Sequence, residues 1–258
     1  MTNIHPTAIV SSKAKLGNNI LVGPFAIIHD DVEIGDDCEI GPNAVIYDYA
    51  RICNNVNIFQ GASISNLPQD LKFDKGKTIL SIGDNTTIRE FVTLHRGTHA
   101  TGQTKIGKNC LIMAYSHIAH DCVLGDNIIV ANSVQMGGHV EIGDWTIIGG
   151  NSAIHQFVKM GSNIMASGLS GIGSDVPPYL MVSGIPARFV GLNIVGLKRR
   201  GFSQEDIALI KDVYHILYLS ALTFTAAKEK IMKKFGEHPL TKRILEFMDK
   251  STRSLIRK

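Results

Sequence analysis

Histidine is the residue type with which this chain could most readily do chemistry. The sequence holds ten histidines, and five of them stand in or beside turns where small polar residues would serve a purely structural purpose. These five are His95, His117, His120, His139 and His155. A neutral imidazole takes up a proton near neutral pH, so each is a candidate general base.

His120 is the strongest of these candidates because Asp121 follows it directly. A carboxylate that accepts from one ring nitrogen would fix the tautomer and stabilise the imidazolium. The pair therefore predicts a base that removes a proton from a sugar hydroxyl or amine. The alternative is a corner histidine and an aspartate that only hold the turn backbone, and the residue types alone leave both interpretations open.

Other chemistries find less support. A catalytic zinc site needs three well-spaced ligands and an open position, and the histidine spacing singles out no such triplet. The glycines fit neither a P-loop nor a dinucleotide-binding loop, and no serine stands in a nucleophile elbow. A metal site is therefore the less supported interpretation, and no motif in the chain indicates an organic cofactor.

A six-residue repeat positions these side chains. Every sixth residue from Ile4 to Ile172 is Ile, Val, Leu or Met at 25 of 29 positions. The four exceptions are Asp70, Gly76, Ala100 and Ala166. Glycine often follows the aliphatic residue, and Asn or Asp often comes next, as in Gly125-Asp126. Gly, Asn and Asp tolerate the left-handed backbone of a sharp corner, so each repeat is predicted to be a short strand and a turn.

Three such units close one triangular coil, and stacked coils bury a continuous aliphatic ladder. We expect a parallel β-helix of about nine coils over residues 1–190. Residues 65–78 and 95–104 lack inward aliphatic residues and are predicted to be projecting loops. Binding residues often lie on such loops.

After Ile172 the repeat is lost, and Pro177, Pro178 and Pro186 are expected to end the coils. Residues 191–258 are predicted to form a small α-helical domain. Its first helix starts at the capping box Ser203-Gln204-Glu205-Asp206, and further helices are expected near 224–235 and 240–250.

Charge and composition limit the kinds of ligand and partner that the chain is expected to bind. Residues 191–258 carry 14 Lys and Arg against 7 Asp and Glu, whereas residues 1–190 carry 12 against 16. This asymmetry indicates either a solvated helix surface or an attractor for an anionic ligand or acidic protein. No apolar run is long enough to span a bilayer, and the N-terminus lacks signal-peptide features. The four cysteines are expected to be reduced thiols in a cytoplasmic protein, without an integral membrane span and without nucleic acid as a partner.

Several segments together resemble the bacterial UDP-N-acetylglucosamine acyltransferases of the hexapeptide-repeat transferase family, the enzymes of the first step of lipid A biosynthesis. The similarity covers nearly the whole chain and rests on these segments: 68–72, Leu94-His95-Arg96-Gly97-Thr98, Ile118-Ala119-His120-Asp121-Cys122, Gly137-Gly138-His139-Val140, 153–157, 175–179, Gly196-Leu197-Lys198-Arg199-Arg200-Gly201-Phe202 and Ser251-Thr252-Arg253. The aliphatic ladder is common to hexapeptide transferases, while the His120 and Arg199 segments in this order are specific.

The resemblance implies a left-handed β-helix and a homotrimer with active sites between subunits. It implies transfer of an (R)-3-hydroxyacyl group from acyl carrier protein to the 3-hydroxyl of UDP-N-acetylglucosamine. His120 would be the general base, Asp121 its orienting carboxylate, and Gly138 the donor of a backbone N–H to the thioester oxyanion.

The resemblance also implies a substrate-binding set. The cleft residues would be His95, His117, His139, His155 and Gln156, with Gln69 and Asp70 contributed by the projecting loop. Asn193, Arg199 and Arg200 would hold the UDP end, and Met165 and Gly168 lie in the stretch that bounds the acyl groove. Some relatives carry a glutamate where this chain has Val195, which puts that uridine contact in doubt.

Two other classes of function compete. The same base could acylate a 3-amino UDP-sugar, or the chain could be another hexapeptide sugar acyltransferase or acetyltransferase. A related lipid N-acyltransferase would need an extra N-terminal domain, whereas the repeat here begins at Ile4. A non-catalytic scaffold would leave His120, Asp121 and the arginine pair without a role.

Overall fold

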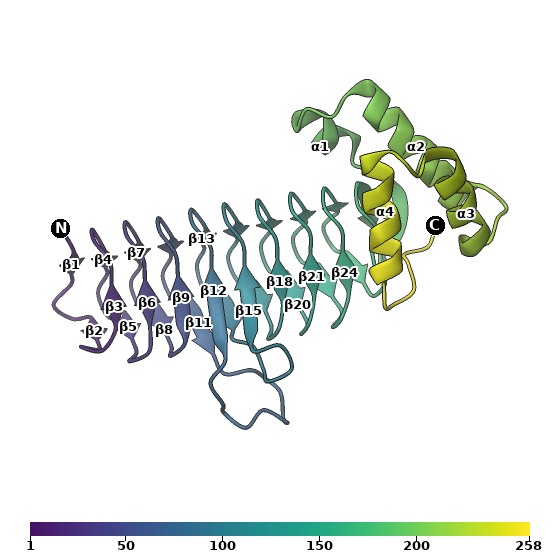
Figure 1. Cartoon of the computed structure of the whole chain (residues 1–258). Helices are drawn as coiled ribbons and strands as arrows, with labels where there is room; N and C mark the ends of the chain where they lie inside the picture. Colours follow the sequence, from purple (N-terminus) through teal and green to yellow (C-terminus); the bar gives the residue numbers. More distant parts are fainter.

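The computed structural model describes residues 1–258, and it is a long three-sided prism with helices packed at one end (Figure 1). The chain winds through three parallel sheets in the repeating order A, B, C, so that each coil adds one short strand to each face. The N-terminus lies at the far end of the prism from the helices.

The three sheets consist of the following strands. Sheet A contains β1 Asn3–Ile4, β4 Leu21–Val22, β7 Glu39–Ile40, β10 Asn57–Ile58, β13 Thr87–Ile88, β16 Leu111–Ile112, β19 Ile129–Val130, β22 Ile147–Ile148, β25 Met165–Ala166, β27 Leu180–Ser183 and β28 Arg188–Leu192. Sheet B contains β2 Ile9–Val10, β5 Ile27–Ile28, β8 Val45–Ile46, β11 Ser63–Asn66, β14 Thr93–His95, β17 His117–Ile118, β20 Gln135–Met136, β23 Ala153–Ile154 and β26 Gly171–Ile172. Sheet C contains β3 Lys15–Leu16, β6 Glu33–Ile34, β9 Ala50–Ile52, β12 Ile79–Ile82, β15 Gln103–Ile106, β18 Val123–Leu124, β21 Glu141–Ile142 and β24 Lys159–Met160.

The aliphatic ladder forms the core, as the sequence predicts. In sheet B, Ile118 lies opposite Leu94 on one side and Met136 on the other, in parallel register. All three side chains are buried, as are the ladder residues of the neighbouring coils. Each coil thus buries aliphatic side chains that no single coil could cover, which stabilises the stack as a whole. The expected left-handed parallel β-helix of hexapeptide repeats, followed by α-helices, is confirmed.

We name each corner of the prism by the two sheets it joins. At almost every corner the third residue after the ladder position has a left-handed φ, for example Asn55 (φ 54°) at a C–A corner and Asp121 (φ 60°) at a B–C corner. The glycine directly after the ladder residue was expected to adopt the left-handed backbone of the corner. In the structure it generally does not, and its lack of a side chain instead allows the next coil to approach. At Gly143, a Cβ would lie 2.7 Å from the Ser162 backbone nitrogen of the next coil. Glycine there permits close stacking, whereas Asn and aromatic residues occupy most of the left-handed positions.

The C–A corners carry a ladder of polar side chains along the prism. Asp126 accepts from the Lys108 N–H (2.8 Å), and the Asp126 N–H in turn donates to Asp144 Oδ1 (2.9 Å). The same contact links Asn18 to Asp36 and Asp36 to Asn54 in earlier coils. These Asx side chains satisfy turn N–H groups that would otherwise have no protein partner.

Two loops leave the B–C corner between β11 and β12 and between β14 and β15, in agreement with the sequence (Figure 1). They contact each other where His99 Nε2 lies 2.6 Å from Asp74 Oδ1. Arg96 is buried beneath them, with its guanidinium 4.6 Å from the centre of the Tyr49 ring and 5.7 Å from that of Phe73. The loops therefore form one packed unit beside the prism.

The end of the β-helix differs from the expectation that prolines stop the coils. After Pro177 and Pro178 the chain adds β27 parallel to β25, then turns back through β28, which pairs antiparallel with β27. A short helix, α1 Ile194–Arg199, follows directly and was not predicted. Its N-cap is Asn193, whose side chain accepts from the Gly196 N–H.

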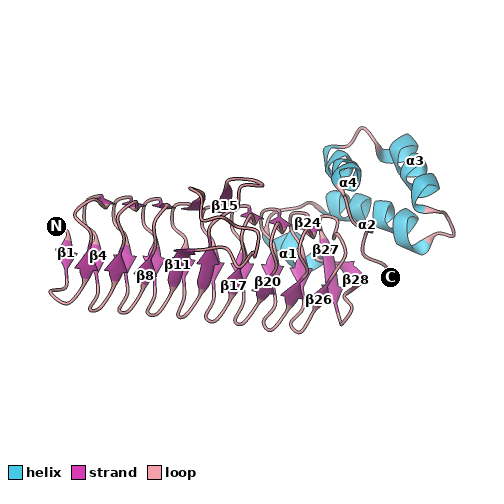
Figure 2. Ribbon diagram, turned by 90° about the horizontal axis from the view of Figure 1, so that it is seen from below, coloured by secondary structure: helices cyan, strands magenta, loops and turns pink.

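The remaining helices lie against the end of the prism (Figure 2). They are α2 Gln204–Leu219, α3 Phe224–Phe235 and α4 Pro239–Lys250. The capping box at the start of α2 is formed by Ser203 and Asp206, as predicted. None of these helices has the length and apolarity that crossing a bilayer requires.

The C-terminal tail returns to the β-helix and is fixed by one buried carboxylate. Asp175 accepts from the Ser251 hydroxyl (2.5 Å) and from the backbone N–H groups of Thr252 and Arg253 (both 3.2 Å). Arg253 then donates to the carbonyl oxygens of Gly173 and Gln156. The tail thereby buttresses the last B–C corners.

Candidate functional site

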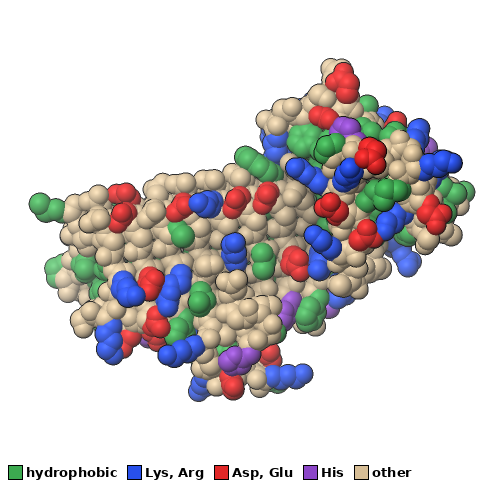
Figure 3. Space-filling model, in the orientation of Figure 1, with side chains coloured by type: hydrophobic (Ala, Val, Ile, Leu, Met, Phe, Trp, Pro, Cys, Tyr) green, Lys and Arg blue, Asp and Glu red, His purple; other side chains and the backbone are tan.

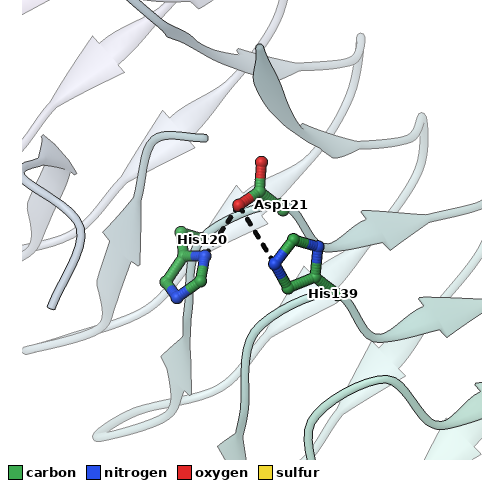
Figure 4. Close-up of side chains that lie close together, drawn as sticks. All are labelled: His120, Asp121 and His139. Carbon is green, nitrogen blue, oxygen red and sulfur yellow. Dashed lines mark hydrogen bonds and ion pairs between the residues drawn. The ribbon is translucent and has the colours of Figure 1, made fainter. Parts of the chain in front are cut away.

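His120 and Asp121 occupy the B–C corner between β17 and β18. His120 Nδ1 lies 2.7 Å from Asp121 Oδ2, and the Asp121 side chain is fully buried (Figure 4). Because the carboxylate can only accept when ionised, Nδ1 carries the hydrogen and the Nε2 lone pair is left free. The sequence left open whether Asp121 contacts the imidazole or only the turn backbone, and the structure shows the contact with the imidazole.

Burial is the largest influence on the Asp121 carboxyl and raises its pKa. The hydroxyls of Thr101 and Thr98, the His120 ring and the Thr98 N–H oppose it, and together they hold the pKa below its usual value. Asp121 is therefore a carboxylate at neutral pH, as an orienting partner of a base must be.

His139 approaches the same carboxylate from the next coil, with Nε2 3.5 Å from Asp121 Oδ2 (Figure 4). Its ring stacks on Phe157 at 4.5 Å and meets His120 edge to face. The three residues could together offer ligands to a metal ion. However, Oδ2 already receives His120 Nδ1 at 2.7 Å, which is a hydrogen-bond contact that a metal would have to replace. The geometry fits proton transfer better than metal binding.

Gly138 lies directly beneath the His120 ring. A Cβ at this position would come within 2.7 Å of His120 Cε1 and 2.9 Å of Nε2, so only glycine leaves room for the imidazole. The Gly138 N–H donates to no acceptor within the chain. An unpaired N–H beside the basic nitrogen is what an oxyanion contact requires.

Two further histidines extend the cluster along sheet B. The His95 and His117 rings meet edge to face at 4.9 Å, and His117 Nδ1 lies 2.7 Å from Thr93 Oγ1. Burial, reinforced by the nearby His117 and His120, lowers the pKa of His95 to about 4. Burial and His120 also lower the pKa of His117. Both rings are neutral at pH 7 and can exchange hydrogen bonds with a polar ligand without a buried charge.

The exposed residues expected around the cluster share its corner. His155 and Gln156 follow β23, and His155 Nδ1 lies 3.1 Å from the Gln156 carbonyl oxygen. Gln69 and Asp70 lie on the loop after β11, where Asp70 Oδ1 accepts from the Lys72 N–H (2.9 Å). These residues, the four other histidines and Gly138 therefore line one edge of the prism.

The basic residues expected at the nucleotide end lie elsewhere. Arg200 is the C-cap of α1, and its guanidinium lies 5.3 Å from the centre of the Trp145 ring at a C–A corner. Arg200 Nε and Nη1 are buried without a hydrogen-bond partner, while Arg199 is exposed. Burial, and secondarily Arg199, lowers the pKa of Arg200. Buried donors without a partner are costly, so this guanidinium is well suited to an anionic ligand.

Asn193 is committed to local structure. Its Oδ1 caps α1, and its Nδ2 donates to the Asn163 carbonyl oxygen (3.0 Å) at a C–A corner. Val195 lies on α1 with its side chain exposed. Asn193 thus places α1 and the arginines that follow it against the prism.

The acyl-groove candidates lie on a third part of the prism. Met165 is on β25 in sheet A, and Gly168 follows at the A–B corner, where it is exposed. Within one chain, therefore, the base, the arginines and the acyl-groove residues lie on three different edges. A single chain does not bring them together.

Sequence reasoning missed three contributors. Thr98 and Thr101 donate to the Asp121 carboxylate from the loop after β14, and Trp145 lies against Arg200. The only sequence signal for the threonines was that their loop interrupts the ladder. Trp145 could have been noticed as the single tryptophan, placed where other C–A corners carry Asn or Asp.

Family comparisons match both parts of the chain. Residues 175–256 match the family described as UDP N-acetylglucosamine O-acyltransferase, domain 2. Residues 13–48 and 103–138 match the bacterial transferase hexapeptide repeat.

Solved structures match over nearly the full length. The chain is 41% identical to a UDP-N-acetylglucosamine acyltransferase from Bacteroides fragilis, with 99% of this chain and 100% of that chain covered and a TM-score of 0.97. It is 38% identical to the Francisella novicida enzyme of the same description, with 99% and 94% covered and a TM-score of 0.96. The Arabidopsis enzyme is 32% identical, with 99% and 100% covered and a TM-score of 0.86.

Proposed function

The chain belongs to the UDP-N-acetylglucosamine acyltransferase family, and from this membership we propose that it transfers an (R)-3-hydroxyacyl group from acyl carrier protein to the 3-hydroxyl of UDP-N-acetylglucosamine. The observation that carries the proposal is the His120–Asp121 pair at 2.7 Å with the unpaired Gly138 N–H beside it. A base and an oxyanion donor at one point are the two groups that acyl transfer needs.

In the proposed reaction, His120 Nε2 removes the proton from the sugar 3-hydroxyl while that oxygen attacks the thioester carbonyl. Asp121 accepts from Nδ1–H throughout and stabilises the imidazolium. The Gly138 N–H donates to the oxygen of the tetrahedral intermediate. When the intermediate collapses, the C–S bond breaks and the imidazolium returns its proton to the departing thiolate. The products are the ester and the free carrier-protein thiol, and no cofactor is consumed.

The neutral histidines and the loop would bind the rest of the substrates. His95 and His117 can hydrogen-bond to sugar hydroxyls without adding charge, because burial lowers the pKa of each. Exposed and half-buried polar groups at the same corner would reach the sugar and the acyl chain, and we assign these roles to His139, His155, Gln156, Gln69 and Asp70.

The diphosphate would bind at Arg199 and Arg200. Arg200 has two buried donor nitrogens without partners, and phosphate oxygens accept such charge-assisted bonds well. Asn193 fixes the start of α1 and so sets where both arginines lie. Val195, exposed on the same helix, cannot form a hydrogen bond with uridine through its side chain.

We further propose that the active unit is a homotrimer. The base, the arginines and the acyl-groove pair Met165 and Gly168 lie on different edges of one prism, so an adjacent subunit has to supply what one edge lacks. A closed ring of three gives each base the same neighbour. Sedimentation of active enzyme tests this, and an active monomer would contradict it.

The acidic carrier protein would be attracted by the basic helical end of the chain. Figure 3 shows lysines and arginines over these helices, with acidic side chains among them. Lys228 pairs with Asp249 and is therefore a weaker candidate than Lys230, Lys233 and Lys234, which are exposed on α3. We place the enzyme in the cytoplasm, where thiols such as those of its four unpaired cysteines stay reduced.

Changing Lys230, Lys233 and Lys234 to Gln should raise the apparent KM for the acyl carrier protein several-fold at low salt and leave the sugar KM unchanged. The difference should shrink as salt is added, because the Debye length is about 10 Å at 0.1 M. Steady-state kinetics at two salt concentrations measure both effects. A variant that responds to neither carrier protein nor salt would identify this surface as solvated helix only.

The decisive assay combines purified protein, UDP-N-acetylglucosamine and a panel of 3-hydroxyacyl carrier proteins, with products identified by mass spectrometry. We expect one acyl group per sugar in an ester that hydroxylamine cleaves. A hydroxylamine-stable product from a 3-amino sugar would instead identify an N-acyltransferase. Absence of transfer to either acceptor would refute the proposed function.

A further inference from the structure

The Asp121 carboxylate receives four hydrogen bonds although it has almost no exposure to solvent. Oδ1 accepts from the Thr98 N–H (2.9 Å) and from the Thr101 hydroxyl. Oδ2 accepts from the Thr98 hydroxyl and from His120 Nδ1, each at 2.7 Å. Three of the four donors therefore come from two threonines, and only one comes from the histidine that the carboxylate orients.

Both threonines belong to the loop between β14 and β15, and the loop is built to present them. The Thr98 hydroxyl accepts from the Ala100 N–H (3.2 Å), which leaves its own hydrogen for Asp121. The Thr98 carbonyl oxygen accepts from the Gly102 N–H (2.8 Å) and closes the turn. At Gly97 the loop passes so close to the Gln103 backbone that no side chain would fit. The Thr101 hydroxyl shares its one hydrogen between Asp121 and the Gln103 carbonyl oxygen, which is 2.9 Å away. Backbone contacts therefore hold both hydroxyls in place.

The arrangement differs from that of the aspartates at the C–A corners. Asp126 and Asp144 accept backbone N–H groups from the preceding coil and stabilise the turn. Asp121 also accepts from one backbone N–H of the preceding coil, that of Thr98, but it additionally accepts from two threonine hydroxyls and His120 Nδ1. Its own N–H donates to Thr104 Oγ1 (2.8 Å). The loop that interrupts the repeat after His95 therefore supplies hydrogen-bond donors to the Asp121 side chain. Without that loop, the carboxylate would be expected to accept turn N–H groups, as Asp126 and Asp144 do.

We infer that Thr98 and Thr101 are positioning residues of the acyl transfer, because their donors hold Asp121 as an anion turned toward His120 Nδ1. The inference rests on the proposed function for its catalytic meaning. Without these donors the carboxylate would be stabilised mainly by His120, and the imidazolium would in turn be stabilised more strongly by the carboxylate. The base would then pick up a proton at higher pH and be less available at neutrality.

Other titratable groups face this pair and remain unchanged in the test. They are His139 from the turn after β20, His95 from β14, His117 from β17 and the buried Cys122 thiol beside Asp121. The comparison between variants therefore reports the threonine donors alone.

The test replaces Thr98 with Val and, separately, Thr101 with Val. We expect kcat to fall about 10-fold or more, the loss associated with one hydrogen bond to a charged group, while the KM for UDP-N-acetylglucosamine changes little. The acid limb of the pH–rate profile should move to higher pH in both variants. Thr98→Ser and Thr101→Ser keep the hydroxyl and should restore both the rate and the limb.

Thr104→Val is the matched control, because Thr104 contacts the Asp121 backbone N–H and not the carboxylate. It should lower thermal stability without moving the acid limb. If Thr98→Val and Thr101→Val also leave the limb at its wild-type position, their role is structural and the inference is wrong.

A measurement that does not depend on turnover separates this inference from the proposed function. In protein with ¹³C-labelled histidine, the NMR titration midpoint of His120 should be higher in Thr98→Val than in the wild type. An unchanged midpoint would overturn the inference even in an active enzyme. A raised midpoint in a protein that transfers no acyl group would support the positioning role and refute only the proposed reaction.

Discussion

The B–C and C–A corners of the prism have the same turn conformation, but the side chains at the two corners make different contacts. At both, the third residue after the ladder position is left-handed, as Asp121 and Asn127 are in one coil. At the C–A corners, Asp126 and Asp144 bind turn N–H groups of the preceding coil. At three B–C corners in the later coils, the equivalent positions carry His120, Gly138 and Gln156, and Asp121 is held by a loop. An earlier B–C corner keeps Asp48, which accepts from the Asp31 N–H (2.8 Å). Under the proposed function, one backbone geometry therefore serves stability at the C–A corners and chemistry at the B–C corner of His120.

The difference between the corners shows how a solenoid corner can hold a side chain other than the Asx residue that stabilises the turn. The Asx ladder satisfies turn N–H groups, so a corner that gives up its Asx residue leaves such a group free. At Gly138 the free N–H lies beside His120, where the proposed reaction uses it to bind the oxyanion. Trp145 is an exception on the C–A side, since its ring lies against Arg200, the residue that we propose binds the diphosphate.

The largest expected effect comes from His120→Ala. Loss of a general base lowers the rate about 10²–10⁴-fold, and we expect a folded protein with wild-type thermal stability. The matched variant at the same repeat position is Asp126→Ala, which removes the acceptor of the Lys108 N–H. It should cost about 1 kcal/mol of stability and leave kcat unchanged. Near-wild-type turnover by His120→Ala would show that the B–C corner, like the C–A corner, has only a structural role.

The second effect concerns acid stability. Burial lowers the pKa of His95 to about 4 in the folded chain, below the usual 6.5, so the unfolded state binds its proton first as the pH falls. The free energy of unfolding therefore does not depend on the titration of His95 above pH 6.5. It decreases between pH 6.5 and 4, by about 3 kcal/mol at most. Denaturant unfolding of wild type and His95→Gln across this range measures it. Parallel stability curves would show that His95 titrates normally.

The third effect tests the exception at Trp145. Arg200→Ala should raise the KM for UDP-N-acetylglucosamine at least about 10-fold, or roughly 1.5–3 kcal/mol for bonds to a charged group. Trp145→Ala should raise the same KM less, because it removes only the ring beside the guanidinium. The KM for the carrier protein is the internal control. If Arg200→Ala leaves the sugar KM unchanged, the diphosphate lies elsewhere.

The last comparison pairs two glycines, one at each type of corner. In Gly143→Ala the new Cβ meets the Ser162 backbone 2.7 Å away, so the coils must shift at a cost of about 1–3 kcal/mol of stability. In Gly138→Ala the Cβ meets only the His120 ring, which can rotate away. We expect this variant to keep its thermal stability and lose activity. Thermal unfolding and initial rates measure both, and the reverse outcome would contradict the assignment of the two corners.

Much of the fold could be predicted because the repeat is local. Each ladder residue contacts the equivalent residues of adjacent coils, so a period of six was enough to identify the core, the corners and the two projecting loops. The helices α2, α3 and α4 were likewise visible in capping and spacing. The β27–β28 hairpin and α1 were missed, since their pairing depends on the last coil and on the Asn193 cap.

The sequence alone determined the three-sided prism and singled out His120–Asp121 as the candidate base and its carboxylate, because ladder spacing and adjacent residues are local properties. Tertiary structure decided what surrounds that pair. Thr98 and Thr101 reach Asp121 from a loop some twenty residues earlier in the chain, and Gly138 lies under the imidazole from the following coil. It also decided that Arg200 and Met165 lie on other edges than the base. The reason is physical: hydrogen bonds and close approach depend on distance in space, which the spacing along this chain specifies only within its repeat.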